Sequence, residues 1–168
     1  YNSKEERPQY STFSVKESFT QSLQEQLGYR NLTEHQYAVA SFIIGSLDDD
    51  GYLRRSIDSI VDDLSFRANV ETTEEEVLEM LKIIQEFEPA GVGARDLREC
   101  LLLQIRSCKK TPAVENAVKI LKNHFTEFTN KHFQKIMTRM NITEDELKAA
   151  MAKILKLNPS PVGPSDAS

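Results

Sequence analysis

The hydrophobic positions of this 168-residue chain recur three and four residues apart along almost its whole length. Near the start, Phe19, Leu23 and Leu27 are spaced by four, and Ser14 with Glu17 fits a capping box. Such spacing places apolar side chains on one face of an α-helix. No stretch shows the alternation of apolar and polar residues that indicates a half-buried strand. The pattern therefore predicts an all-α fold with short connections between helices.

Capping residues mark the expected starts of the later helices. Short polar side chains can accept hydrogen bonds from the unpaired N–H groups of a first helical turn. Residues of this kind precede apolar helical patterns at Thr33, Ser56, Thr73, Asp96 and Thr111. Two more helices are expected at roughly 130–140 and 144–157.

The length of the chain suits one domain or two small ones. The C-terminal helices have helix-turn-helix-like character, with Asn141 at the turn.

The chain also contains an internal repeat. Residues 73–93 align with residues 143–163 at an offset of 70 without gaps, and seven of the 21 positions are identical. Apolar positions also coincide, and each copy follows a shorter amphipathic helix. We interpret the two copies as related helix pairs.

The two halves of the chain carry opposite charge. Residues 1–88 hold eight Lys or Arg and 18 Asp or Glu, a net charge of −10. Residues 89–168 hold 13 Lys or Arg and eight Asp or Glu, a net charge of +5. This split predicts two surfaces with different electrostatic partners.

Composition points to a cytoplasmic protein. No apolar run approaches the roughly 18 residues of a membrane span, so no membrane partner is expected. The N-terminus has neither an initiator Met nor a signal peptide, so we interpret the chain as a piece of a longer protein. Cys100 and Cys108 fall in one expected helix, about 12 Å apart, which exceeds the reach of a disulfide. Free thiols fit a reducing compartment.

The stretch FEPAGVGARDLREC, residues 87–100, looks at first like a phosphate-binding loop. A dinucleotide-binding loop has three glycines after a β-strand, whereas here Asp96 takes the third position and a helix comes before the loop. The Gly-Lys-Ser/Thr of a Walker loop is absent as well. A nucleotide-binding enzyme is therefore the weakest of the alternatives.

We interpret the same stretch as a structural corner or hinge between two helices. Pro89 should stop the first helix, and Gly91 and Gly93 permit positive φ and close packing. Asp96 should cap the next helix while Glu99 reaches back. Capping does not explain Arg95.

The acidic stretch SLDDDGYL, residues 46–53, resembles part of a calcium loop. Position 12 of such a loop would be Ile57, where a glutamate is required. A turn after a helix is the better interpretation. Because Asp48, Asp49 and Asp50 repel one another, a basic partner outside the chain is a reasonable expectation.

We find no catalytic constellation, cofactor site or metal site in the sequence. Its three histidines are scattered, and no nucleophile has an expected base beside it. The expectation is a protein that is not an enzyme.

DNA binding by the C-terminal helices is the rival hypothesis. Several basic residues could contact a nucleic-acid backbone, namely Lys119, Lys122, Lys131, Lys135 and Arg139. However, the helix that would read bases opens with Glu144, Asp145 and Glu146, and carboxylates there would repel phosphates.

Three segments in order resemble the core-binding region of bacterial sigma-54 factors. These are SLDDDGYL, FEPAGVGARDLRECLLLQI and LNPSPVG, and the resemblance covers roughly residues 14–163. Asp48–Leu53 and Pro89–Leu103 match signature positions of the family, whereas Ser160 and Val162 depart from its last signature. The resemblance implies two packed helical bundles and a transcription initiation factor. On this basis we predict a flexible N-terminal segment over 1–13, a larger N-terminal lobe over 14–108, a smaller three-helix C-terminal lobe over 109–157 and an exit linker over 158–168.

The resemblance also implies the partners. The family's region binds core RNA polymerase, including the flap of the β-subunit. Promoter DNA and the activator ATPase would be met only through parts of the full-length factor that this chain lacks. The residues that we expect to contact polymerase are Asp48, Asp49, Asp50, Tyr52, Arg95 and Arg98.

Overall fold

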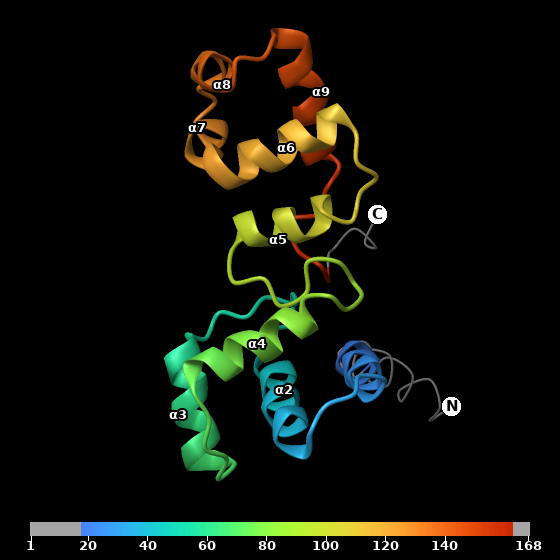
Figure 1. The fold of residues 1–168 in the computed structure, drawn as a ribbon, viewed down its shortest axis with the longest axis vertical. Coiled ribbons are helices and arrows are strands. Elements are labelled where there is room, and N and C mark those ends of the chain that lie inside the picture. The colour runs from blue at the N-terminus through green and yellow to red at the C-terminus, as the bar shows by residue number, and fades with distance from the viewer. Residues whose placement is uncertain (1–17, 163–168) are drawn as a thin grey trace, which may run out of the picture. The chain divides into compact units, whose positions relative to one another are not determined.

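The computed structural model describes residues 18–162, and every regular element within that range is a helix. This confirms the prediction of an all-α fold (Figure 1). The expected capping box of Ser14 and Glu17 lies outside the described residues. Within the described range no helix is long and apolar enough to cross a membrane.

The chain divides into two compact units. Among the described residues, unit 1 consists of residues 18–49 together with Leu53–Glu88. Unit 2 consists of Asp50–Tyr52 and residues 89–162. The short Asp50–Tyr52 segment therefore interrupts unit 1 in sequence while belonging to the fold of unit 2.

This division differs from the expected boundary between residues 108 and 109. Helix α5 (Leu97–Ile105), which we expected in the N-terminal lobe, belongs to unit 2 because it packs against α6 (Pro112–Asn123) and contacts α9 (Glu144–Leu155). The boundary between the units therefore falls at Pro89, before α5, and not at the Lys109-Lys110 loop after it.

Unit 1 contains a first helix over residues 18–28 in its described part, followed by α2 (Glu34–Ser46), α3 (Ile57–Arg67) and α4 (Glu74–Ile84). Helices α2 and α3 both pack against α4. Helix α4 ends at Ile84, five residues before Pro89, so the proline alone does not explain where the helix ends. Phe87 is nevertheless buried, because the turns that follow the helix direct it into the core.

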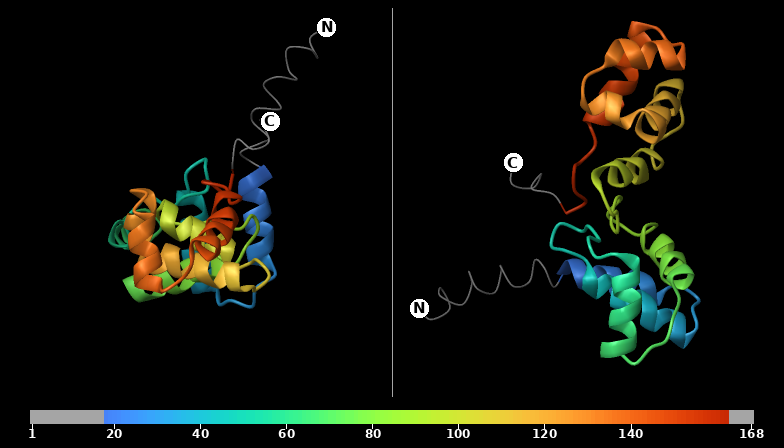
Figure 2. Two further views of the ribbon diagram at one scale, coloured as in Figure 1. Left: turned by 90° about the horizontal axis from the view of Figure 1, so that it is seen from above. Right: turned by 90° about the vertical axis from the view of Figure 1, so that its left-hand side faces the viewer.

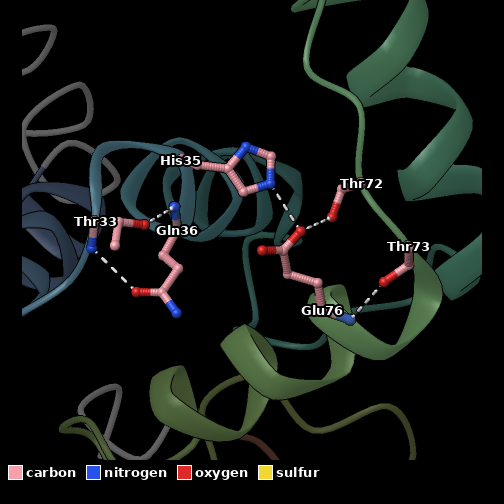
Figure 3. A network of polar contacts seen from close by, with 6 residues as sticks. All are labelled: Thr33, His35, Gln36, Thr72, Thr73 and Glu76. Carbon is pink, nitrogen blue, oxygen red and sulfur yellow. Dashed lines mark hydrogen bonds and ion pairs between the residues drawn. The ribbon is translucent and has the colours of Figure 1, made fainter.

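Polar contacts at the helix starts tie α2 to α4 (Figure 3). The Thr33 capping box forms as expected, with the Gln36 side chain reaching back to the Thr33 N–H. At α4, by contrast, Thr73 accepts from the Glu76 N–H, but the Glu76 carboxylate does not reach back. It accepts from the Thr72 hydroxyl instead and lies 2.8 Å from Nε2 of His35 on α2.

These contacts change the acidity of Glu76. The hydrogen bond from Thr72 and then the contact with His35 hold the pKa of the Glu76 carboxyl below its ordinary value of 4.5. The ionised carboxylate is thus part of the packing of α4 against α2.

Unit 2 contains α5, α6, α7 (Phe125–Thr129), α8 (Phe133–Met140) and α9. Helix α6 packs most extensively against α9 and also against α5 and α7 (Figure 1). The short α7 was not expected from the sequence. Its aromatic residues Phe125 and Phe128 pack against the core of unit 2.

The predicted repeat has a structural counterpart. Helices α4 and α9 begin 70 residues apart, each directly after a threonine N-cap, Thr73 and Thr143. The residues at matching positions Val77 and Leu147, like Ile84 and Ile154, are buried in their own unit. The copies differ at the cap, because Glu146 completes a capping box that Glu76 does not.

The two cysteines are free thiols, as predicted, although not for the expected reason. Helix α5 ends at Ile105, so Cys108 lies beyond it. Cys100 is buried within α5, and Cys108 is exposed.

Candidate functional site

The turn at Asp50–Tyr52 lies between two segments that come much later in the sequence. The Gly93 N–H donates to the Gly51 carbonyl at 2.9 Å, and the Val162 N–H donates to the Asp50 carbonyl at 3.4 Å. The Asp50 carboxylate accepts from the Tyr52 N–H at 3.2 Å and so closes the turn on itself. We call the assembly of Asp50–Tyr52, Pro89–Ala94 and Asn158–Val162 the junction.

Close packing at the junction requires a glycine at position 51. Gly51 has a φ of +91°, and a Cβ built on it would lie 2.6 Å from Cγ of Pro161. Both the backbone angle and the space exclude an ordinary side chain. The Asp-Gly pair of the acidic motif therefore shapes this turn rather than a calcium site.

Tyr52 supports the junction from inside. Its side chain is only 6% exposed, and its hydroxyl donates to the Pro159 carbonyl. With Ala94 and Cys100 it forms a small hydrophobic cluster. The expectation that Tyr52 contacts a partner is therefore revised, because the ring and the hydroxyl are both engaged within unit 2.

The glycine corner after Pro89 is built from its own backbone hydrogen bonds. Gly91 and Gly93 have φ values of +98° and +81°. The Val92 and Ala94 N–H groups donate to the carbonyls of Pro89 and Gly91. A phosphate loop needs free backbone N–H groups, whereas these are occupied within the corner or by the Asp50–Tyr52 turn. The contacts support the structural interpretation of the glycines.

The second corner is held by a residue that the sequence did not single out. The side-chain amide of Gln104 donates to the Asn158 carbonyl at 2.7 Å, and its oxygen accepts from the Asn158 N–H at 2.9 Å. Gln104 also donates to Sγ of Cys100, one helical turn earlier. The one signal for this role was a glutamine directly after three leucines in a predicted helix. The segment after α9 thereby runs back to α5 (Figure 2, right).

Burial determines the chemistry of Cys100. Removal from solvent raises the pKa of the Cys100 thiol, and this effect exceeds the lowering effects of the neighbouring Tyr52 and Gln104 side chains. The thiol is thus a packed core group rather than a nucleophile. A Cβ on Gly91 would lie 3.0 Å from its sulfur, which explains the first glycine of the corner.

The structure gives Arg95 a role in the start of α5. The Asp96 side chain accepts from the Glu99 N–H at 2.9 Å, as a capping residue should. Glu99 reaches back one residue further than expected and accepts from the Arg95 N–H at 2.8 Å. The Arg95 guanidinium then binds both oxygens of the same carboxylate, at 3.0 and 2.8 Å. Arg95 therefore holds the Glu99 carboxylate in place at the first turn of α5.

Arg98 connects α5 to the far end of α6. Its guanidinium donates to the carbonyls of Leu121 and Lys122 at 2.9 and 2.8 Å. These carbonyls belong to the last turn of α6, where a cation also interacts favourably with the helix dipole. Arg98 is thus a helix-capping residue inside unit 2.

The remaining acidic and basic candidates are more exposed. Asp48 and Asp49 are exposed, and Asp48 forms an ion pair with Arg54 at 2.8 Å. All five basic candidates are exposed but are distributed over α6, the turn before α8 and α8 itself: Lys119, Lys122, Lys131, Lys135 and Arg139. Arg139 pairs with Glu127 at 3.2 Å.

A short turn joins α8 to α9, and Asn141 takes the left-handed conformation at this turn. The carboxylates at the start of α9 are exposed, namely Glu144, Asp145 and Glu146. They would face phosphates if α9 entered a groove, so this helix pair is poorly suited to reading DNA. No group of three or more His, Cys, Asp or Glu residues among 18–162 is arranged to hold a metal ion.

Comparison with known sequences determines the family. The profile described as "Sigma-54 factor, core binding domain" matches residues 9–167, nearly the whole chain. The chain belongs to the sigma-54 factor family. Its matched region is the core-binding domain, which confirms the resemblance in the three motif segments.

Individual sigma-54 relatives support this assignment. The RNA polymerase sigma-54 factor of Azotobacter vinelandii is 36% identical over 154 residues, which cover 89% of this chain and 30% of the relative. The sigma-54 factor of Salmonella typhimurium is 37% identical over 147 residues, covering 84% and 30%. That of Escherichia coli K12 is 35% identical over 147 residues, with the same coverage. The chain thus spans about a third of the length of these relatives.

The sigma-54 motifs that are farthest apart in sequence meet at the junction. The acidic motif contributes Asp50–Tyr52, the long central motif contributes the glycine corner and α5, and the last motif contributes Asn158–Val162. In this chain the family's signature residues therefore mainly build the junction and the helix that follows its glycine corner.

Proposed function

We propose that this chain is the part of a sigma-54-type initiation factor that docks the factor on core RNA polymerase, and that it catalyses no reaction. The observation that carries the proposal is the junction, which uses the family's signature residues for support rather than for a pocket. The Cys100 thiol packed beside it has a raised pKa, and the N–H groups of Val92, Gly93 and Ala94 are occupied by backbone carbonyls. A junction of this kind suits a scaffold that presents surfaces to a protein partner.

We assign the acidic surface of unit 1 to the polymerase contact. Asp48 and Asp49 are exposed beside the junction in sequence, and the flap of the β-subunit is the proposed partner. Promoter DNA and the activator ATPase would act through other parts of the full-length factor. This role would place the chain in the cytoplasm with the polymerase.

A charge-reversal experiment tests the acidic surface. The double variant Asp48→Lys/Asp49→Lys should bind core polymerase several-fold more weakly at low salt, because like charges would then oppose each other. Asp50 is left unchanged, since its carboxylate closes the turn. The control Asp62→Lys/Glu79→Lys makes the same change in net charge at exposed positions of α3 and α4.

Two outcomes would count against this assignment. Equal affinity of the double variant and the parent at low salt would remove the Asp48–Asp49 surface from the contact. An equal loss in the control would attribute the effect to net charge instead.

The rival function, DNA binding through α8 and α9, is tested by a salt titration with duplex DNA. Phosphate contacts would give an affinity that falls steeply with salt concentration. The exposed carboxylates at the start of α9 predict weak binding with no sequence preference.

A further inference from the structure

Unit 2 contains a groove of about 550 Å³ that lies along α6 and the end of α5. Its floor is aliphatic and includes Ile105, Val114 and Val118. Val114 and Val118 are one helical turn apart on α6, and Val118 is only half-buried. The groove shares no lining residue with the junction, so it is a separate feature of the fold.

The rim of this groove is strongly basic. Arg106, Lys110, Lys119 and Lys122 line it, against a single carboxylate, that of Glu115. All four cationic residues are exposed, and none of them forms an ion pair within the described part of the chain. An aliphatic floor beneath unpaired cations is complementary to a segment that carries apolar side chains flanked by carboxylates.

The lining favours a protein segment over a nucleic acid. Single-stranded nucleic acids are held by stacking of bases on aromatic side chains as well as by basic residues. No aromatic residue lines this groove. The half-buried Val118, which lies between lysines of the groove, instead suits contact with an apolar side chain of an amphipathic helix.

We propose that the groove between α5 and α6 binds an acidic amphipathic segment of core RNA polymerase. This inference rests on the proposed polymerase-docking function and adds a second, basic contact surface to the acidic one of unit 1. The opposite charges of the two halves of the chain then correspond to two different contacts. Lys119 and Lys122 would pair with partner carboxylates, while Val118 contacts the partner's apolar side chains.

Cys108 provides a natural reporter for this groove. It lines the groove and is exposed, whereas Cys100 is buried. The whole 168-residue chain is treated with a thiol-alkylating reagent, alone and after formation of a complex with core polymerase. The alkylation rate of Cys108 should fall at least tenfold in the complex. Binding affinity is measured in parallel by co-purification over a range of concentrations.

Charge reversal tests the chemistry of the partner. The variant Lys119→Glu/Lys122→Glu should bind core polymerase at least tenfold more weakly. The matched control, Lys131→Glu/Lys135→Glu, changes net charge equally at exposed positions outside the groove and should lose less than twofold. Circular dichroism of both variants verifies that the helices are retained.

The outcomes separate this inference from the function on which it rests. A complex in which Cys108 reacts as fast as in the free chain overturns the groove assignment but leaves polymerase docking intact. If polymerase protects Cys108 but the Lys119→Glu/Lys122→Glu variant binds as tightly as the parent, the segment in the groove is not acidic. Protection by a single-stranded oligonucleotide but not by polymerase would make the groove a phosphate-binding site, contrary to the proposal. If no complex forms at all, both polymerase docking and the groove assignment are wrong.

Discussion

Replacement of Gly51 by alanine is the most direct perturbation of the junction. The φ of +91° costs a residue with a Cβ about 1–2 kcal/mol. The new methyl group would also lie 2.6 Å from Cγ of Pro161, and overpacking of this kind costs about 1–3 kcal/mol. Gly51→Ala should therefore reduce the free energy of unfolding by about 2–5 kcal/mol, a large part of the stability of a typical domain.

Urea denaturation followed by circular dichroism measures this loss. The control is Gly45→Ala in α2, because a Cβ there would have no atom within 4 Å. In a helix that change should be neutral or stabilise the fold by about 0.5–1 kcal/mol. Adding Pro161→Ala to Gly51→Ala should recover the packing part of the loss but not the backbone part.

A small loss of unfolding free energy in Gly51→Ala would contradict the packing of this turn against Pro161. If Gly51→Ala lost less than about 0.5 kcal/mol, as surface substitutions do, the turn would not be packed against Pro161 as described. If Pro161→Ala restored nothing, the loss would come from the backbone angle alone.

Three further predictions concern Gln104, Glu76 and the two thiols. Gln104→Ala removes two hydrogen bonds to the backbone of Asn158 and should cost about 1–3 kcal/mol in urea denaturation; no loss would mean that this corner is not held by the side chain. Because the pKa of Glu76 is lowered in the fold, its carboxylate contributes stability that is present above its ordinary pKa and lost as pH falls through the lowered value. Glu76→Gln should therefore show a smaller loss of unfolding free energy than the parent between about pH 6 and pH 3, and an identical pH profile would contradict the contact. In the native chain a thiol reagent should modify Cys108 at once and Cys100 only on unfolding, because burial raises the pKa of the Cys100 thiol and shields it; mass spectrometry would reveal early modification of Cys100 if this is wrong.

Local patterns in the sequence predicted the helices well. Thr33, Ser56, Thr73, Asp96 and Thr111 all act as N-caps, because capping depends on a side chain and the backbone only three residues away. Helix ends were less predictable. Turns after α4 and α5 terminate those helices before the residues that we expected to continue them.

The junction could not be predicted from the sequence, because it depends on contacts between distant segments. The Gly51 turn packs against Pro161, which comes about 110 residues later in the sequence. Tyr52 and Arg98 looked like exposed partner contacts, yet the fold supplies carbonyl acceptors for both. Gln104 carried almost no signal, since its two partners are backbone atoms of Asn158, which any residue type would provide.

Docking of this chain by itself on core RNA polymerase can be measured directly. The most direct measurement is the equilibrium affinity of the purified chain for core polymerase, compared with its affinity for duplex DNA at the same salt concentration. We expect saturable binding to polymerase and only weak, salt-sensitive binding to DNA. A folded chain that did not bind core polymerase, or that bound duplex DNA more tightly than polymerase, would contradict the proposed docking function.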